Sequence, residues 1–252
     1  MPELFQAALA TAGLGWLVSI ALVAGVVYGF AGFGAALIYM PVAVMFLPPA
    51  VAIAAFSVSA MSSFVTVVPK ALPLVNLRSV TELIVSASVA ASLGIWVLSV
   101  ADVTFIRWCV VAVCSVTLAA LIAGWRYKVL PGLRTRIAIG AGAGFIGGLS
   151  GLTGPIMVLF QLAGRDSPAT TRATTIVFLT MTSLLMLPLL HLQGLLTGAA
   201  VALGALLLLP YGVGAVVGQA LFTPGRESFY RMVAYVIIGA ATIAGLPIWD
   251  QI

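Results

Sequence analysis

The sequence GFAGFG occupies positions 29–34, in the middle of an apolar stretch that runs from residue 12 to residue 47. A second glycine-rich run, GLSGLTGP, occupies positions 148–155 and is also embedded in apolar sequence. Glycine lets a backbone turn sharply and lets two backbones approach closely. Each run therefore predicts a break in a helix, the first at 29–34 and the second at 148–154.

The two breaks belong to an internal repeat. A shift of 119 positions along the chain brings glycines and prolines of one half onto those of the other. The coinciding pairs are Gly25 with Gly144, Gly29 with Gly148, Gly32 with Gly151, Pro49 with Pro168, and Pro69 with Pro188. The sequence predicts one transmembrane domain over 1–252, made of repeat one (12–124), a basic cytosolic loop (125–136) and repeat two (137–249).

Composition places most of this domain in lipid. Apolar residues make up 63% of the chain and charged residues only 7%, whereas a soluble domain carries roughly 25% charged residues. The apolar segments do not alternate with polar residues, and a membrane sheet must close into a barrel, so helices are expected throughout. Helices are predicted at 12–30, 35–47, 49–68, 79–100 and 104–124, and again at 137–147, 155–163, 168–190, 195–222 and 228–247.

The length of the first stretch predicts an inverted arrangement. Residues 12–47 are too many for one span of about 20, so they form either a re-entrant hairpin or two spans. Either option crosses the membrane an even number of times, and three helices follow, so each repeat crosses an odd number of times. Two such repeats in series must have opposite orientations, as in many secondary transporters.

The distribution of charge gives the orientation. On the inverted arrangement ten basic residues share one side: Lys70, Arg78, Arg126, Lys128, Arg134, Arg136, Arg165, Arg172, Arg226 and Arg231. Glu3, Asp102 and Asp250 lie on the other side, with only Arg107 near them. The positive-inside rule then predicts a multi-pass protein of the inner membrane with both termini outside.

The paired motifs at 29–34 and 148–155 resemble those of the sulfite exporter TauE/SafE family, and the basic central loop fits the same pattern. The resemblance covers essentially the whole chain, although Ala31, Ala35 and Ala36 stand where the first motif is usually richer in glycine. It implies a secondary transporter, working by alternating access and most simply as an exporter. The implied substrates are small sulfur-containing anions such as sulfite, sulfoacetate or other organosulfonates.

The glycine breaks are the first candidates for an anion site. A helix that starts inside the membrane presents unpaired backbone N–H groups and a partial positive charge. The predicted contacts from the two breaks are Gly29, Gly32, Phe33, Gly34, Gly148, Ser150, Gly151, Thr153 and Gly154. The alternative is that these glycines serve only to pack helices closely.

Hydroxyl side chains and one arginine extend the candidate site. Ser59, Ser62, Ser63 and Thr66 follow a helical period and predict one polar stripe. Thr171, Thr174, Thr175 and Thr182 form a similar stripe in the second repeat. From these stripes we expect Ser59, Ser63 and Thr175 to contact substrate, with Arg172 at the inner mouth. The alternatives are that the hydroxyls bond their own helix carbonyls and that Arg172 faces the cytosol.

Two other functions fit parts of the sequence. The run GLSG at 148–151 matches the G-x-S-G pattern of intramembrane serine proteases, and Ser150 with His191 would make a catalytic dyad. Against this, position 31 of the first repeat carries alanine where the second carries Ser150. An anion channel is the other alternative, and it would need a continuous polar lining.

The remaining expectations concern partners. No cluster of metal ligands, no cofactor motif and no nucleotide-binding loop is present in the sequence, so no metal or cofactor is expected. The expected partners are a small anionic substrate, a coupling proton or ion and the lipid bilayer, with no nucleic acid. Glu82 is the best available proton carrier. The oligomeric state is open, and a homodimer is compatible with the sequence.

Overall fold

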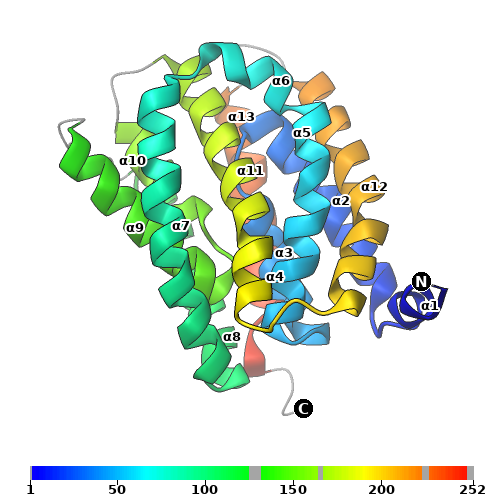
Figure 1. Cartoon of the computed structure of the whole chain (residues 1–252). Coiled ribbons are helices and arrows are strands. Elements are labelled where there is room, and N and C mark those ends of the chain that lie inside the picture. The colour runs from blue at the N-terminus through cyan, green and yellow to red at the C-terminus, as the bar shows by residue number, and fades with distance from the viewer. Residues whose placement is uncertain (1, 125–131, 164–166, 223–226, 249–252) are drawn as a thin grey trace.

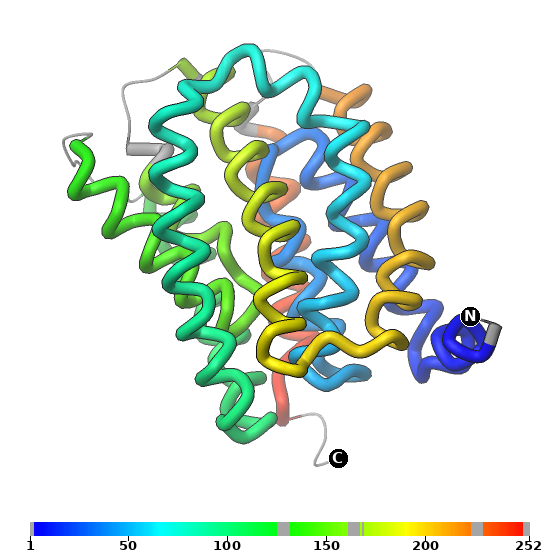
Figure 2. Tube along the Cα trace, in the orientation of Figure 1, coloured from blue at the N-terminus to red at the C-terminus, as the bar shows by residue number. Residues whose placement is uncertain are grey.

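The computed structural model describes residues 2–124, 132–163, 167–222 and 227–248, and every regular element in these ranges is a helix. Six of the helices described there are long and apolar enough to cross a membrane. The predicted all-α membrane fold is therefore confirmed. Figure 1 shows the helices side by side in one bundle, and Figure 2 follows the same path as a tube.

The first half of the chain forms a short helix followed by a helix hairpin and three longer segments. The elements are α1 (Pro2–Leu9), α2 (Leu14–Ala31), α3 (Ala35–Phe46), α4 (Pro49–Ser59), η1 (Ala60–Ser62), α5 (Ser63–Thr66), α6 (Val68–Ala71), η2 (Leu72–Leu74), α7 (Leu77–Val100) and α8 (Val103–Ile122). The predicted helix 49–68 is one apolar span of 18 residues, Pro49–Thr66, interrupted by the turn η1. Helix α1 was not predicted.

The second half repeats this order. Its elements are α9 (Leu133–Ser150), α10 (Gly154–Ala163), α11 (Pro168–Leu192), α12 (Gly198–Leu221) and α13 (Glu227–Ala244). Helices α2 and α9 both have 18 residues. A shift of 119 places Leu14 on Leu133 and Ala31 on Ser150, so the two helices begin and end at matching positions.

The predicted basic loop at 125–136 is too long at its C-terminal end. Residues 125–131 lie outside the described residues, but α9 already begins at Leu133 and includes Arg134 and Arg136. The predicted start of this helix at 137 was therefore four residues late. Arginine is a good helix former, and Arg136 gains an ion pair on the neighbouring helix, which explains why these charged residues are helical.

Local sequence explains where several helices begin. Asn76, Asp102, Ser167 and Thr197 each precede a helix, and each side-chain oxygen accepts a hydrogen bond from a backbone N–H of the first turn. Such caps satisfy donors that have no partner inside the helix. Proline stands at the first position of both α4 and α11, where its missing N–H costs nothing.

Glycines bring two pairs of helices into backbone contact. A Cβ added to Gly25 of α2 would clash with the carbonyl oxygen of Tyr211 in α12, and one added to Gly144 of α9 would clash with that of Ala87 in α7. One turn further along, Gly29 meets α12 and Gly148 meets α7 in the same way. Close approach of this kind is how small residues hold membrane helices together. Each pair, α2–α12 and α7–α9, joins the two halves of the chain.

The two hairpins run in opposite directions. In Figure 1, α2 rises from the lower end of the bundle and α9 descends from the upper end, while α1 and the end of α13 both lie at the lower end. The starts of α7, α9, α11 and α13 lie at the upper end, together with α6. These upper segments carry Lys70, Arg78, Arg134, Arg136, Arg172 and Arg231, whereas Arg107 lies near the start of α8 at the lower end.

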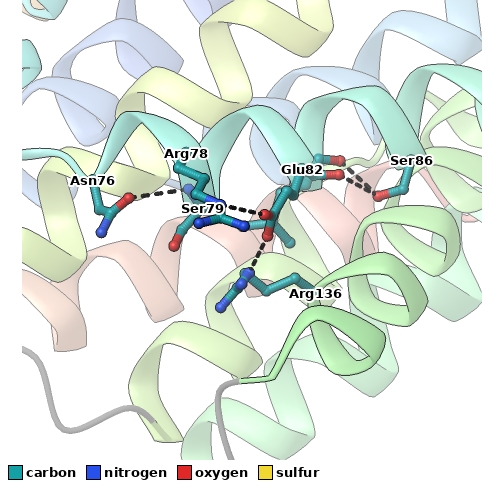
Figure 3. A network of polar contacts seen from close by, with 7 residues as sticks. Asn76, Arg78, Ser79, Glu82, Ser86 and Arg136 are labelled. Carbon is teal, nitrogen blue, oxygen red and sulfur yellow. Dashed lines mark hydrogen bonds and ion pairs between the residues drawn. The ribbon is translucent and has the colours of Figure 1, made fainter.

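An ion pair closes the upper end of the α7–α9 contact. The Nε group of Arg136 donates to Glu82 Oε2 at 2.6 Å, and both side chains are 19% exposed. Arg78, one turn before Glu82, donates to the other carboxylate oxygen at 3.3 Å. Figure 3 shows the two arginines on either side of Glu82, with the Ser86 hydroxyl one turn further along. The network joins α7 of one half to α9 of the other.

Candidate functional site

The two predicted breaks are left-handed turns at the ends of α2 and α9. Helix α2 ends at Gly32 with φ of 80°, and α9 ends at Gly151 with φ of 77°. Gly34, just before α3, has φ of 92°. Positive φ is unfavourable for residues with a Cβ, which is the reason that glycine stands at these positions. Helix α3 then starts within the bundle and has 12 residues, or about 18 Å, less than the roughly 30 Å of a bilayer core.

A small cavity of about 40 Å³ lies between the two breaks. Gly34, Ala35 and Ala36 line it from the first break, and Gly151, Thr153 and Gly154 line it from the second. One water molecule occupies at least 10–15 Å³ on this kind of measure, so the space suits a few waters or one small inorganic anion. The starts of α3 and α10 both contribute backbone to its wall.

Hydroxyl groups provide most of the cavity's polar side chains. The lining hydroxyls belong to Tyr28, Ser63, Thr153, Thr180, Ser183 and Tyr211. The Tyr28 hydroxyl donates to the Ile176 carbonyl at 3.1 Å and lies 3.0 Å from Thr180 Oγ1. The Ser63 hydroxyl is buried and interacts with the Tyr211 hydroxyl. Both side chains line the cavity, so a ligand there has access to this pair of hydroxyls.

Aromatic rings enclose one side of the cavity. Tyr28 and Phe56 each pack against Tyr211, with ring centroids 6.1 and 5.9 Å apart. Tyr39 packs against Phe56, with ring centroids 5.2 Å apart. All four side chains are buried. Such a wall excludes water and so strengthens electrostatic contacts inside the cavity.

A larger, basic vestibule of about 600 Å³ is lined by the ends of α2 and α12, the starts of α11 and α13 and the short helix α6. These segments lie at the upper end of the bundle in Figure 1. Arg172, at the start of α11, contributes to its wall and donates a hydrogen bond from Nη2 to the carbonyl of Gly29. The Arg172 guanidinium also lies 5.0 Å from the centre of the Phe222 ring. Among the described residues, the other cations of the lining are Lys70 and Arg231, and Lys70 donates to Gln219 Oε1 at 2.8 Å.

Comparison with known proteins identifies the chain. The family model of the sulfite exporter TauE/SafE matches residues 17–244. The chain belongs to the TauE/SafE sulfite exporter family. No curated protein and no solved structure matches it. This TauE/SafE protein is therefore a membrane permease for sulfur-containing anions and not an enzyme.

The structure of this TauE/SafE protein brings together five of the residues proposed from sequence. Gly34, Ser63, Gly151, Thr153 and Gly154 line the small cavity. A second group, Phe33, Arg172 and Thr175, lines the vestibule instead. The sequence predicted one site, whereas the structure separates these residues into two spaces that share no lining residue among those described.

The other proposed residues have structural contacts of their own. Gly29 and Gly148 pack against α12 and α7, and neither lines the cavity. Gly32 lies beneath Arg172, because a Cβ there would come 2.7 Å from Arg172 Cγ. Ser59 donates to the carbonyl of Phe56 at 2.8 Å.

Most hydroxyls of the two polar stripes bond their own helix. Ser62 donates to the carbonyl of Ser59, Thr66 to that of Ser62, Thr175 to that of Thr171 and Thr182 to that of Phe178. These contacts are the alternative that the sequence left open. Of the first stripe, Ser63 is the residue that lines the cavity, where its hydroxyl lies near that of Tyr211.

The protease alternative finds no support in the geometry of the described residues. Ser150 is fully buried and donates to the Ile146 carbonyl of its own helix at 2.7 Å. His191 is exposed and lies in the last turn of α11. No hydrogen bond joins these two side chains in the part of the chain that the structure describes, so no dyad forms.

Glu82 also lies away from the candidate site of the TauE/SafE protein. Its carboxylate is held by Arg78 and Arg136 and lines neither the cavity nor the vestibule. Its observed contacts connect α7 to α9 (Figure 3). The identity of a coupling ion stays a prediction.

Several site residues were missed by sequence reasoning. Tyr28 and Tyr211 contribute buried hydroxyls and rings to the cavity, and Thr180 bonds Tyr28 across the α2–α11 contact. Two signals were available. Tyr28 immediately precedes the first break, and Tyr211 follows Pro210 in the middle of an otherwise apolar helix. Polar groups buried in a membrane helix usually have a function.

Proposed function

We propose that this TauE/SafE protein is a secondary transporter that exports small sulfur-containing anions across the inner membrane by alternating access. The observation that carries the proposal is the cavity between the two breaks, which the starts of α3 and α10 both line. Sulfite, with four heavy atoms, is the substrate that best fits the size of this cavity. Sulfoacetate and other organosulfonates would need the space to widen during the transport cycle.

Backbone groups would provide most of the anion's partners. The cap of α3 is Gly34, which offers no side-chain acceptor to the first N–H groups of that helix. The first four N–H groups of a helix lack partners within it and carry the positive end of its dipole. Pro155 has no N–H, so the start of α10 offers fewer donors, and the Thr153 hydroxyl beside it adds one.

The absence of a cation from the described cavity lining favours transient binding. No lysine or arginine lines the cavity among the described residues. Hydrogen bonds to a charged group are worth about 1.5–3 kcal/mol each, which offsets part of the cost of taking an anion out of water. The resulting affinity is modest, and a carrier must release its substrate on the other side.

The repeated architecture supports alternating access. The hairpins α2–α3 and α9–α10 run in opposite directions (Figure 1), and the cavity lies between them. In transporters with inverted repeats the substrate site lies at the interface between the repeats, and one repeat moves against the other. The positive-inside rule supports an orientation in which the basic upper end faces the cytosol and both termini are outside.

Flux measurement tests the proposal. The purified protein is reconstituted in proteoliposomes, and uptake of sulfite, sulfoacetate and taurine is measured with empty liposomes as the control. We expect saturable sulfite uptake that trans-loaded sulfite accelerates, which is the behaviour of a carrier. Uptake that does not saturate would indicate the channel alternative, and no uptake of any of the three anions would refute the proposal.

Reporter fusions test the orientation. Fusions at residue 1 and residue 252 should report an external location, and a fusion within 125–131 should report the cytosol. A cytosolic N-terminus would contradict the inverted-repeat arrangement, because odd-crossing repeats then could not place the basic segments inside.

A further inference from the structure

The cavity and the vestibule lie one helical turn apart on two segments of the chain. On α11, Thr180 lines the cavity and Ile176, four residues earlier, lines the vestibule. On the segment that begins α5, Ser63 lines the cavity and Val67, four residues later, lines the vestibule. One turn of helix is about 5.4 Å long. The two spaces are therefore stacked along the bundle with a thin barrier between them.

Tyr28, in the last turn of α2, lies across this barrier. Its hydroxyl donates to the carbonyl of Ile176, a vestibule residue, at 3.1 Å and lies 3.0 Å from Oγ1 of Thr180, a cavity residue. These two bonds join α2 to α11 at the level where one space ends and the other begins. Tyr28 is 3% exposed, Ile176 1% and Thr180 2%, so the passage is closed at this level.

The end of α2 is held on its two sides by contacts of different kinds. Towards α12, Gly25 and Gly29 lie directly against backbone carbonyl oxygens. Towards α11, side-chain hydrogen bonds hold the same part of α2, because Arg172 donates to the Gly29 carbonyl and Tyr28 donates to the Ile176 carbonyl. Glycine-to-backbone packing parts only when whole helices move, whereas a side-chain bond breaks with a change of rotamer. The α2–α11 contact is therefore the one suited to opening and closing.

We propose that Tyr28 is the gate residue between the cavity and the vestibule. In the closed form its hydroxyl fastens α2 to α11 and its ring, packed on Tyr211, closes the passage. Release of the hydroxyl lets the two helices part and joins the cavity to the vestibule, whose lining includes the exposed side chain of Lys70. The inference rests on the proposed function in one respect, because it takes the cavity to hold the cargo of an alternating-access carrier. It assigns one of the two alternating barriers to a named side chain.

Thiol accessibility tests the gate without any substrate. Ser63→Cys places a thiol on the cavity wall, in a background that carries Cys109→Ser and Cys114→Ser. The full chain is held in nanodiscs and treated with aminoethyl methanethiosulfonate, and the rate of modification is measured by mass spectrometry. A buried thiol reacts through transient opening, so this rate follows the population of the open form. Thr171→Cys, on the vestibule wall, is the reference for a thiol outside the gate and should react quickly with either residue at position 28.

Two conservative substitutions should open the gate. Tyr28→Phe keeps the ring and removes the hydroxyl, so it loses both bonds to α11. Thr180→Val keeps the shape of the side chain and removes one of the two bonds. We expect Thr180→Val to raise the rate at Ser63→Cys about tenfold, which corresponds to about 1.4 kcal/mol in the opening equilibrium, and Tyr28→Phe to raise it further.

The chain offers a matched control for each substitution. Tyr39→Phe also removes a buried tyrosine hydroxyl, but that hydroxyl has no hydrogen-bond partner among the described residues and lines neither space. Thr182→Val removes a hydroxyl that bonds carbonyls of its own helix. Both controls should leave the rate at Ser63→Cys unchanged.

Three outcomes would overturn the inference. The first is that Ser63→Cys reacts as fast as Thr171→Cys when Tyr28 is intact, because no barrier would then separate the spaces. The second is that neither Tyr28→Phe nor Thr180→Val changes the rate at Ser63→Cys. The third is that the control substitutions raise this rate as much, which would indicate a general loosening of the bundle.

The same variants separate this inference from the proposed function. A rate at Ser63→Cys that depends on Tyr28 and Thr180, in a chain without flux of sulfite, sulfoacetate or taurine, would support the gate and refute the transport proposal. Saturable sulfite flux in a chain whose cavity thiol reacts at the same rate in all variants would support the transport proposal and refute the gate.

Discussion

The two glycine breaks share a backbone geometry but have different surroundings. Gly32 and Gly151 have nearly equal φ values, 80° and 77°, and each ends an 18-residue helix. Gly32 lies beneath the side chain of Arg172, whereas Gly151 is covered by Met40 and Ile53 from the other half of the chain. Gly32 therefore lies beside the basic vestibule, whereas Gly151, which lines the small cavity, packs against apolar side chains.

This difference shows that an internal repeat reproduces the backbone turn but not the side chains around it. The turns recur because glycine is needed at the same backbone position in both halves. The neighbouring side chains do not recur, since Arg172 stands at a position whose counterpart 119 residues earlier is Ile53. Similar turns thus give the protein one break beside a positive charge and one break without it, and the following predictions test that distinction.

The largest effect on stability is expected where a glycine lies against the backbone of a neighbouring helix. Gly25→Ala and Gly144→Ala place a Cβ on a carbonyl oxygen of the paired helix, and backbone cannot move aside as a side chain can. Overpacking of this kind costs 1–3 kcal/mol or more, so we expect a clear drop in melting temperature and in folded yield, measured by thermal scanning and size-exclusion chromatography in detergent. Gly15→Ala is the control on the same helix as Gly25, because nothing lies within 4 Å of the added Cβ. Equal melting temperatures for all three variants would contradict the close α2–α12 and α7–α9 contacts.

The next effect concerns the breaks themselves. Gly32→Val and Gly151→Val put a branched side chain at positive φ, which costs of order 1–3 kcal/mol. The nearest atoms, Arg172 Cγ at 2.7 Å and Met40 Sδ at 2.9 Å, belong to flexible side chains, so we expect the variants to insert while sulfite flux falls to the level of empty liposomes. If both variants transport sulfite like the wild type, the breaks serve packing alone.

A smaller effect separates two neighbouring hydroxyls of the second break. Thr153 lines the cavity, whereas Ser150 bonds its own helix. Thr153→Val should weaken sulfite binding about tenfold, which corresponds to the loss of about 1.4 kcal/mol. Ser150→Ala should leave flux close to the wild-type rate. Complete loss of function in Ser150→Ala, with labelling of Ser150 by a fluorophosphonate, would instead revive the protease alternative.

The smallest effect is expected at the ion pairs of the α7–α9 contact (Figure 3). Glu82→Gln removes the carboxylate of the Glu82–Arg136 ion pair, and a pair that is partly exposed contributes up to about 1 kcal/mol. We expect a slightly lower melting temperature and no change in how sulfite flux depends on pH. Arg78→Gln removes only the exposed partner, whose side chain is 89% exposed, and should have less effect still. Loss of pH dependence in Glu82→Gln would show that Glu82 carries the coupling proton.

Much of the fold was predictable because its signals are local. Apolar length gave the helices within a few residues, and glycine gave the breaks, since both depend on the chemistry of single segments. The misplaced start of α9 shows the limit of this reasoning. The charge of Arg134 and Arg136 is typical of a loop. Glu82, which forms an ion pair with Arg136 and so stabilises it in the helix, is 54 residues away in the sequence.

The candidate site was predictable in position and only partly in composition. Gly34, Gly151, Thr153 and Gly154 could be named from the break motifs, because a break must expose its own backbone. Tyr28, Thr180 and Tyr211 could not be assigned to the same space, because their contacts join segments as far apart as Tyr28 and Thr180. The hydroxyl stripes misled for a related reason, since periodicity does not tell whether a hydroxyl bonds its own helix or a ligand.

The sequence by itself determined that this chain is a helical membrane protein with two similar halves and a glycine break in each. Composition, segment length and glycine spacing were sufficient, because each acts within a single segment of the chain. Only the tertiary structure decided that the breaks border a small cavity while Arg172 and Phe33 border a separate vestibule. That division depends on which face of α11 packs against the end of α2, and such packing is a property of side chains that meet only in the folded protein.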